Sequence, residues 1–306
     1  MTKEELLSRL DEAETNEEIA EIGKELIALD PESPYGKLAV WETMEYEEAM
    51  ENLDMLREAL DAIRAVVEAR ELPALVDDDR DALVYATVMM NLGFSLLSEG
   101  RTEEAYEVAK EFANFDDEGA FESRTLLYRC MLDLELYKEI IDTLEADPLE
   151  SVVGEHARAI ALLETSAEHD EVFDAVNYAI SLSPDVPFFV VNIWDMPEND
   201  DDADEEEMDV LNDAAYLAEP WCATDKRLAA LSQQTFLFGY LTNRLTDEKE
   251  MKVLRSSYEN IGIANRIESV KKHLDDMEKA GRDPEEIDAE ALSETANILS
   301  ELGEEE

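Results

Sequence analysis

The sequence predicts an all-α fold, a right-handed solenoid of stacked helical hairpins with additional C-terminal helices. Apolar residues recur with the 3.6-residue period of an amphipathic helix through nearly the whole chain, for example at Leu53 and Leu56. Small or apolar residues also recur at a longer spacing, since Gly93, Tyr128 and Ile160 are 35 and 32 residues apart. Each hairpin leaves apolar surface that only a neighbouring hairpin covers, so the repeats are expected to stack.

The spacing of these positions is close to a known repeat length. Tetratricopeptide repeats have a period of about 34 residues and consist of two helices joined by a turn. Residues 89–96 are expected to lie in the first helix of one hairpin and Gly100 in its turn. Ala105 and Ala109 are expected to mark the second helix.

Helices are also expected on both sides of these repeats. Apolar periodicity over 6–26 is interrupted by two prolines at 30–34, and one long helix is expected over 45–70. Strand character is confined to 186–191, where Pro187 argues against a central strand.

The predicted domain organisation has three parts. Residues 1–197 form the tetratricopeptide-like repeat domain, 198–209 an acidic linker, and 210–306 a C-terminal helical extension that packs on or caps the repeats. Nine of the twelve linker residues are acidic. Their alternation resembles a calcium loop, but the turn glycine is missing and Leu211 occupies the position of the terminal bidentate glutamate, so a solvated linker is expected.

The charge of the chain is extreme. The 306 residues include 79 acidic and 25 basic side chains, for a net charge of −54, while 45% of residues are hydrophobic. A globular chain is therefore expected, with neither nucleic acid nor an anionic membrane as a partner, because both require clustered Lys and Arg. Three interpretations of the acidity remain open: a salt-adapted or low-pI host, a site for basic partners, and a nucleic-acid mimic.

Residues with catalytic or metal-binding patterns are scarce. The glycines form no phosphate-binding loop, and the three histidines form no metal-binding motif. Cys130 and Cys222 are expected to be buried, reduced thiols and are too few for a zinc site of four thiolates. We therefore expect no enzyme activity, no catalytic residue, no cofactor and no metal.

The N-terminus predicts the location of the protein. Residues 1–5 lead directly into an acidic amphipathic helix and lack the apolar core of a signal peptide. No apolar run that approaches the ~18 residues of a membrane span is apparent. A cytoplasmic protein is expected.

Several segments within about 20–228 resemble one family. Ser183 and the stretch 188–191 depart from its pattern, and no zinc motif follows Thr224. The segments are 27–34, which ends in Asp-Pro-Glu-Ser-Pro, 82–100 with Asn91-Leu92-Gly93, 179–187 with Ala-Ile-Ser-Leu-Ser-Pro-Asp-Val-Pro, and 215–224 with Ala-Tyr and Trp221. They resemble the suppressor-of-tumorigenicity family of tetratricopeptide-like proteins and similar bacterial modules often attached to a SecA-C-terminal zinc motif. The resemblance implies a binding module and supplies no catalytic residue.

The function expected from these features is non-enzymatic recognition of a peptide or protein in the concave groove of the repeats. First helices line that groove in tetratricopeptide arrays, which gives Asn91, Phe94, Arg129 and Arg158 as candidate partner-binding residues. The arginines could donate to a carboxylate of the partner, or each could pair with a neighbouring glutamate. An acidic decoy that occupies a basic nucleic-acid-binding protein is the alternative function, and an enzyme with an unrecognised site is a third.

The C-terminal extension is too apolar to be free in solution. Phe236, Phe238, Tyr240 and Leu241 lie close together, and an exposed patch of that size is a liability. The helix near 229–243 is expected to close the last hairpin, while the alternative is a homodimer formed through the C-terminal helices.

Added salt is expected to raise the melting temperature. Repulsion among the carboxylates opposes folding, and screening shortens its range to ~8–10 Å near 0.1 M salt. Thermal unfolding measured from low salt upward tests this. A flat or falling melting temperature would mean that the charges are already neutralised or too dispersed to matter.

Overall fold

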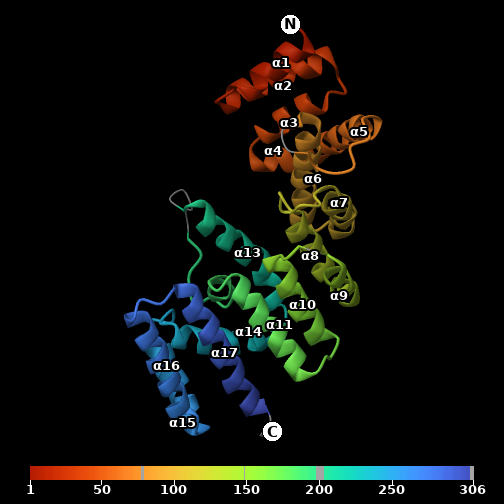
Figure 1. Ribbon diagram of the computed structural model, residues 1–306. Helices are drawn as coiled ribbons and strands as arrows, with labels where there is room; N and C mark the ends of the chain where they lie inside the picture. The colour runs from red at the N-terminus through yellow and green to blue at the C-terminus, as the bar shows by residue number, and fades with distance from the viewer. Residues whose placement is uncertain (77–78, 148, 198–202, 304–306) are drawn as a thin grey trace. The chain divides into compact units, whose positions relative to one another are not determined.

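The computed structural model describes residues 1–76, 79–147, 149–197 and 203–303. Every secondary-structure element in these ranges is a helix, which confirms the all-α prediction (Figure 1). The helices form two compact units, unit 1 at 1–134 and unit 2 at 135–306. The boundary between the two units, at 134/135, lies well before the domain boundary predicted from the sequence at 198–209.

Unit 1 is a succession of neighbouring helices. α3 packs on α5 and α6, and α6 in turn packs on α7 and α8. The described helices are α1 (Lys3–Asp11), α2 (Asn16–Leu29), α3 (Pro34–Glu42), α4 (Tyr46–Glu51), α5 (Leu53–Ala69), α6 (Arg80–Ser98), α7 (Thr102–Phe115) and α8 (Ser123–Asp133).

Local sequence signals start several of these helices. The Thr2 hydroxyl and the Glu5 carboxylate form a capping box at α1. At α3 the Ser33 hydroxyl accepts from the Gly36 amide, and Pro34 occupies the first turn, where its missing N–H costs nothing. The interruption expected at 30–34 is thus a new helix start.

The long helix expected over 45–70 is wrong, because α4 ends at Glu51 and α5 begins at Leu53. The buried Trp41 indole donates to the Ala49 carbonyl at 3.0 Å, and the Asn52 side chain donates to the Glu48 carbonyl at 2.8 Å. Both side chains compete for carbonyls in the last turn of α4, which favours a break.

Small residues set the closest helix contacts in unit 1. A Cβ atom on Gly36 would lie 2.8 Å from the Gly23 carbonyl oxygen, so α2 and α3 meet backbone to backbone. A Cβ on Gly93 would meet only the side chain of Leu126. Gly93 therefore marks the contact between α6 and α8.

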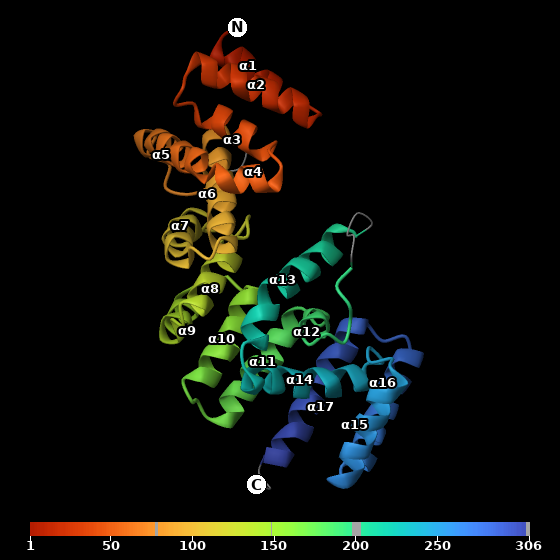
Figure 2. The same cartoon turned by 180° about the vertical axis from the view of Figure 1, so that it is seen from behind.

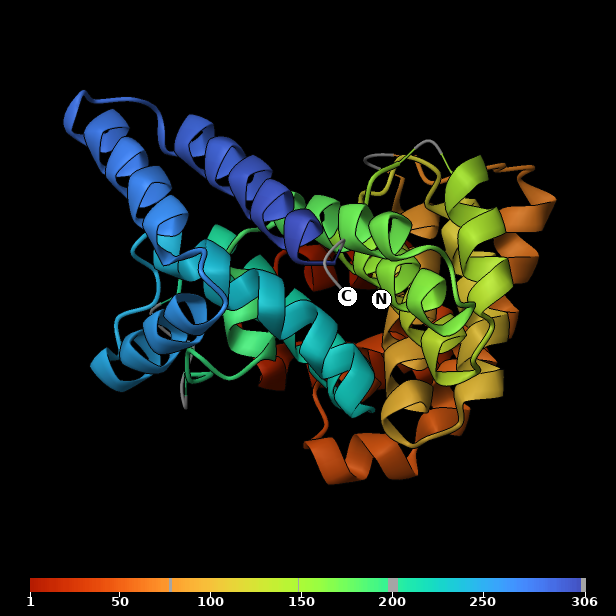
Figure 3. The ribbon, with the colours of Figure 1, turned by 90° about the horizontal axis from the view of Figure 1, so that it is seen from below.

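Unit 2 packs its helices around α10, α11 and α14. α12 lies between α13 and α14 (Figure 2), and α17 packs on both α11 and α14 (Figure 3). The described helices are α9 (Tyr137–Ala146), α10 (Val152–Glu164), α11 (His169–Leu182), α12 (Val186–Val190), α13 (Glu205–Cys222), α14 (Asp225–Leu241), α15 (Glu248–Asn260), α16 (Ala264–Lys279) and α17 (Pro284–Gly303).

The segment with strand character is the short helix α12. Pro187 occupies its first turn, where its fixed φ suits a helix. Phe188 is fully buried, and a Cβ atom on Gly239 of α14 would lie only 2.6 Å from a carbon of its ring. The glycine therefore allows α12 and α14 to pack closely.

The acidic segment is helical in its second half. Residues 198–202, which include Asp200 and Asp202 of the calcium-loop comparison, lie outside the described residues. α13 begins at Glu205, and Asp204 and Glu207 form its capping box. The described second half of the segment is therefore the start of a helix whose Glu206, Glu207 and Asp209 side chains are exposed, and its role as a linker stays a prediction.

Arg227 joins three other elements to the start of α14. Its side chain is almost fully buried and donates to Glu164 of α10 at 2.6 Å, to the Pro220 carbonyl of α13 at 3.0 Å and to the Tyr137 hydroxyl of α9 at 2.7 Å. These bonds distribute its donors over three helices, as a buried guanidinium requires.

The apolar C-terminal residues are buried within unit 2. Phe238, Tyr240 and Leu241 have at most 2% of their surface exposed, and α14 packs on α11, α16 and α17. Arg244 follows α14 and binds Asp185 at 2.8 Å and Asp288 at 2.6 Å. Contacts of this kind favour packing within the chain, while the homodimer stays an untested alternative.

His156 and Trp221 connect α10 to α13. Both side chains are fully buried, and the indole Nε1 donates to Nδ1 of His156 at 3.2 Å. Burial lowers the pKa of His156 from 6.5 to about 3. The folded protein therefore holds a neutral imidazole over the whole range in which an exposed one gains a proton.

Gly36→Ala is expected to destabilise unit 1 by about 2–3 kcal/mol, because the new methyl group meets backbone that cannot move alone. Gly93→Ala meets the end of the Leu126 side chain and not backbone, and it gains about 1 kcal/mol of helix propensity, so its net effect is expected within about 1 kcal/mol of zero. Urea unfolding of both variants measures the difference, and equal losses would contradict this packing.

The free energy of unfolding is expected to decrease as pH decreases, because His156 is buried as a neutral ring. Unfolding exposes an imidazole with pKa near 6.5, so the stability gained by keeping the ring neutral is present above pH 6.5 and lost as pH falls toward 3. Between pH 7 and pH 5 the wild type should lose about 2 kcal/mol more than His156→Gln, which keeps a hydrogen-bond acceptor but does not titrate.

Urea unfolding of the wild type and the His156→Gln variant at both pH values measures this difference. His273→Gln is the matched control, because the His273 side chain is 61% exposed. Unfolding of this control at both pH values measures the effect of removing an exposed histidine. Parallel curves for the wild type and His156→Gln would show that the buried ring does not contribute.

Candidate functional site

The exposed side of α6 is apolar. Residues 82–98 carry no charged side chain, although a third of all residues in the chain are charged. Half of the most apolar 18-residue stretch of α6 is buried, and the remainder is partly or fully exposed. We call the following residues, which recur at helical spacing on that exposed side, the α6 face: Leu83, Val84, Thr87, Met90, Asn91, Phe94 and Leu97.

A small cavity adjoins the start of the α6 face. It has a volume of about 220 Å³, which suits one side chain and is below the usual size of a ligand pocket. Leu7 and Leu10 of α1, Leu38 of α3 and Val84 of α6 supply apolar lining. The cavity therefore lies between α1, α2, α3 and the start of α6.

Charged groups define the edge of this cavity. Arg80 pairs with Asp11, and the Tyr35 hydroxyl donates to Asp81. Burial and this hydrogen bond raise the pKa of Tyr35 well above its usual range. The phenol therefore stays protonated and fixes α3 against α6.

Asn91 connects α6 to α3. Its Nδ2 donates to Oε1 of Glu42 at 3.0 Å. Partial burial raises the pKa of Glu42, and the hydrogen bond from Asn91 opposes that shift. Asn91 thus supplies the polar contact in an otherwise apolar surface.

The four predicted partner-binding residues have different surroundings. Asn91 and Phe94 are partly exposed on the α6 face, whereas Arg129 is only 8% exposed and donates to Asp133 at 3.0 Å. Arg158 belongs to unit 2 and lies 3.7 Å from Glu155. Binding of a partner at these residues stays a prediction, and the arginines have acidic neighbours within their own helices.

The contribution of α3 to this surface was not predicted from the sequence. Tyr35, Leu38 and Glu42 lie beside α6, but α4 and α5 separate the two helices along the chain. The apolar spacing of α3 is visible in the sequence, but the sequence does not show that α6 is its neighbour. The uncharged run at 82–98 is the sequence signal that could have identified the α6 face.

Potential metal ligands are dispersed in the described ranges. Within residues 1–76, 79–147, 149–197 and 203–303, no group of three or more His, Cys, Asp or Glu side chains is arranged to hold a metal ion. Burial raises the pKa of the Cys130 thiol to about 12, so it is unreactive at neutral pH. Cys222 is exposed at the end of α13, contrary to the expectation of two buried thiols.

Comparison of the chain with known protein families, with curated proteins and with solved structures gave no match. α6 is long and apolar enough to cross a membrane by length and composition, although the sequence analysis recognised no such segment. Core helices of globular proteins pass the same test, and half of this stretch is buried in the fold.

Proposed function

We propose that this protein is a non-enzymatic helical-repeat binding protein that recognises a peptide segment of a partner protein through the α6 face. The observation that carries the proposal is the uncharged exposed side of α6 in a chain of net charge −54. A contiguous apolar surface on so acidic a protein is typical of an interaction site.

The packing of unit 1 supports a repeat architecture. α3, α5 and α6 contact one another, and α6, α7 and α8 repeat that arrangement. Successive hairpins of a right-handed tetratricopeptide-like solenoid pack in this way, and their first helices line the binding groove. α6 is such a first helix in this interpretation, and α3 is its predecessor.

The shape and chemistry of the site favour a peptide. The cavity of about 220 Å³ could hold one apolar side chain, and the α6 face continues beyond it with Phe94. Periodic apolar anchors in a groove are the usual mode of recognition for an amphipathic helix. Because Arg129 already contacts Asp133, the proposal depends on apolar contacts and not on a carboxylate clamp.

Substitution of Phe94 by Asp is expected to weaken peptide binding at least roughly tenfold, because it removes an apolar contact and adds a charge. Peptides are first selected by display on the full-length protein at 0.15 M salt, and their affinities are then measured by fluorescence anisotropy. Tyr46→Asp is the matched control, since it adds the same charge at an aromatic residue of unit 1 that is 66% exposed.

Selected peptides should bind Tyr46→Asp within about twofold of the wild type. Wild-type affinity for Phe94→Asp, or a selection that yields no peptide above background, would contradict the proposed site. Thermal unfolding of both variants confirms that the comparison is made on folded protein.

A further inference from the structure

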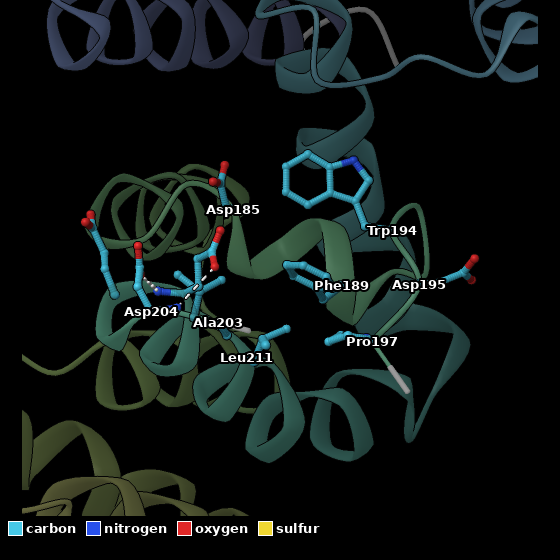
Figure 4. Close-up of a pocket in the computed structure, with 11 residues that line it drawn as sticks. Asp185, Phe189, Trp194, Asp195, Pro197, Ala203, Asp204 and Leu211 are labelled. Atoms are coloured by element: carbon cyan, nitrogen blue, oxygen red, sulfur yellow. Dashed lines mark hydrogen bonds between the residues drawn. The ribbon is translucent and has the colours of Figure 1, made fainter. Parts of the chain in front are cut away.

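A second cavity lies in unit 2 between α12, residues 194–197 and the first turns of α13. Its volume is about 660 Å³, within the range of sites that hold a ligand or a long side chain. Figure 4 shows Phe189, Trp194, Pro197 and Leu211 around the space, contributed by three stretches of chain. It shares no lining residue with the α6 face.

The floor of this cavity is aromatic and held in place. The Trp194 ring stacks on Phe188 at 4.8 Å and meets the edge of Phe189 at 5.4 Å. Its Nε1 donates to the Arg244 carbonyl oxygen at 3.4 Å. These contacts fix the orientation of a half-buried indole, so little side-chain entropy remains to be lost when something binds to it.

The rim of the cavity is acidic. None of the described lining residues is basic, although Arg244 binds Asp185 from outside at 2.8 Å. The carboxylates of the rim belong to Asp185, Asp195, Asp204, Glu206 and Glu207. The combination is therefore an apolar, aromatic floor beneath negative charge.

Helix capping accounts for part of this rim. Asp204 and Glu207 bond the amides of the first turn of α13, and acidic residues at a helix N-terminus are favourable in any protein. Capping does not explain why the cavity that these carboxylates line also contains Trp194 and Phe189. The aromatic floor is an independent feature that points to a ligand.

The chemistry of the cavity selects one kind of occupant. An anion would be repelled, and a neutral apolar group would desolvate carboxylates without compensation. Within the described residues these carboxylates do not converge as a metal site would require. A guanidinium or ammonium group on an aliphatic stem suits both the aromatic and the acidic lining. The cation is attracted to the ring of Trp194 and to the carboxylates, and the stem covers apolar surface.

We propose that this pocket binds the lysine or arginine side chain of a basic segment in a partner protein. The cation lies against Trp194 and is bonded by Glu206 and Glu207, and its stem packs on Leu211. This site does not depend on the α6 face.

The experiment uses the full-length protein and the peptide acetyl-Ala-Leu-Arg-Leu-Ala-amide at 0.15 M NaCl, where the Debye length is about 8 Å. Intrinsic tryptophan emission is the readout, because Trp41 and Trp221 are buried and Trp194 is half-buried. The peptide in which citrulline replaces Arg is the neutral control of the same shape. Saturable binding of the arginine peptide, at least roughly tenfold tighter than the citrulline peptide, is expected.

Two double variants separate this site from the general charge of the protein. Glu206→Gln/Glu207→Gln retains a capping-box residue at 207 and should weaken the arginine peptide roughly tenfold. Asp170→Asn/Glu171→Gln removes the same charge from exposed residues in the first turn of α11 and should change affinity less than about twofold.

Equal loss in both double variants would overturn the proposal, because binding would then follow net charge alone. Equal affinity for the arginine and citrulline peptides would also overturn it, because the pocket would then recognise only apolar surface. Loss confined to the Glu206→Gln/Glu207→Gln variant supports it. Failure of the Phe94→Asp test leaves this result unaffected, since the two sites share no residue.

Discussion

Both units depend on the placement of very few basic side chains. The chain has 25 Lys and Arg residues for 79 carboxylates, so helices that pack together would repel one another wherever their acidic sides meet. Several cations are accordingly placed between elements. Lys37 joins α3 to Glu58 of α5 at 2.8 Å, and Arg227 joins α14 to α10 through Glu164. Such a pair converts repulsion between two helices into attraction, which makes it more valuable here than in a chain of balanced charge.

The same constraint explains why partly buried carboxylates are paired. Arg64 binds both carboxylate oxygens of Glu111, at 2.7 and 2.8 Å, and the Tyr85 hydroxyl donates to the same carboxylate. The guanidinium and the phenol together lower the pKa of Glu111, although burial alone would raise it. Arg244 performs a similar role in unit 2, between Asp185 and Asp288. In each cluster a partly buried guanidinium is bonded to carboxylates from other elements.

Against this background the two proposed sites share one property, which is apolar or aromatic surface that remains open in an acidic protein. The α6 face belongs to a run of 17 residues, 82–98, that carries no charge, and Trp194 lines its cavity together with five carboxylates. Their chemistry differs in what it attracts. The first offers area to apolar side chains, whereas the second offers a ring and negative charge to a cation. A single partner with an amphipathic, basic segment could use either site.

The sequence by itself determined the all-α class and many helix starts, because apolar periodicity and caps such as Ser33 with Pro34 act within a few residues. Tertiary structure decided the rest. The α4–α5 break depends on Trp41 reaching the Ala49 carbonyl, Asn91 meets Glu42 from 49 residues away, and Cys222 is exposed because α13 ends there. Periodicity gives each helix a buried side, but it does not say which helix covers that side. That choice depends on close contacts such as Gly23 with Gly36, which exist only once helices pack.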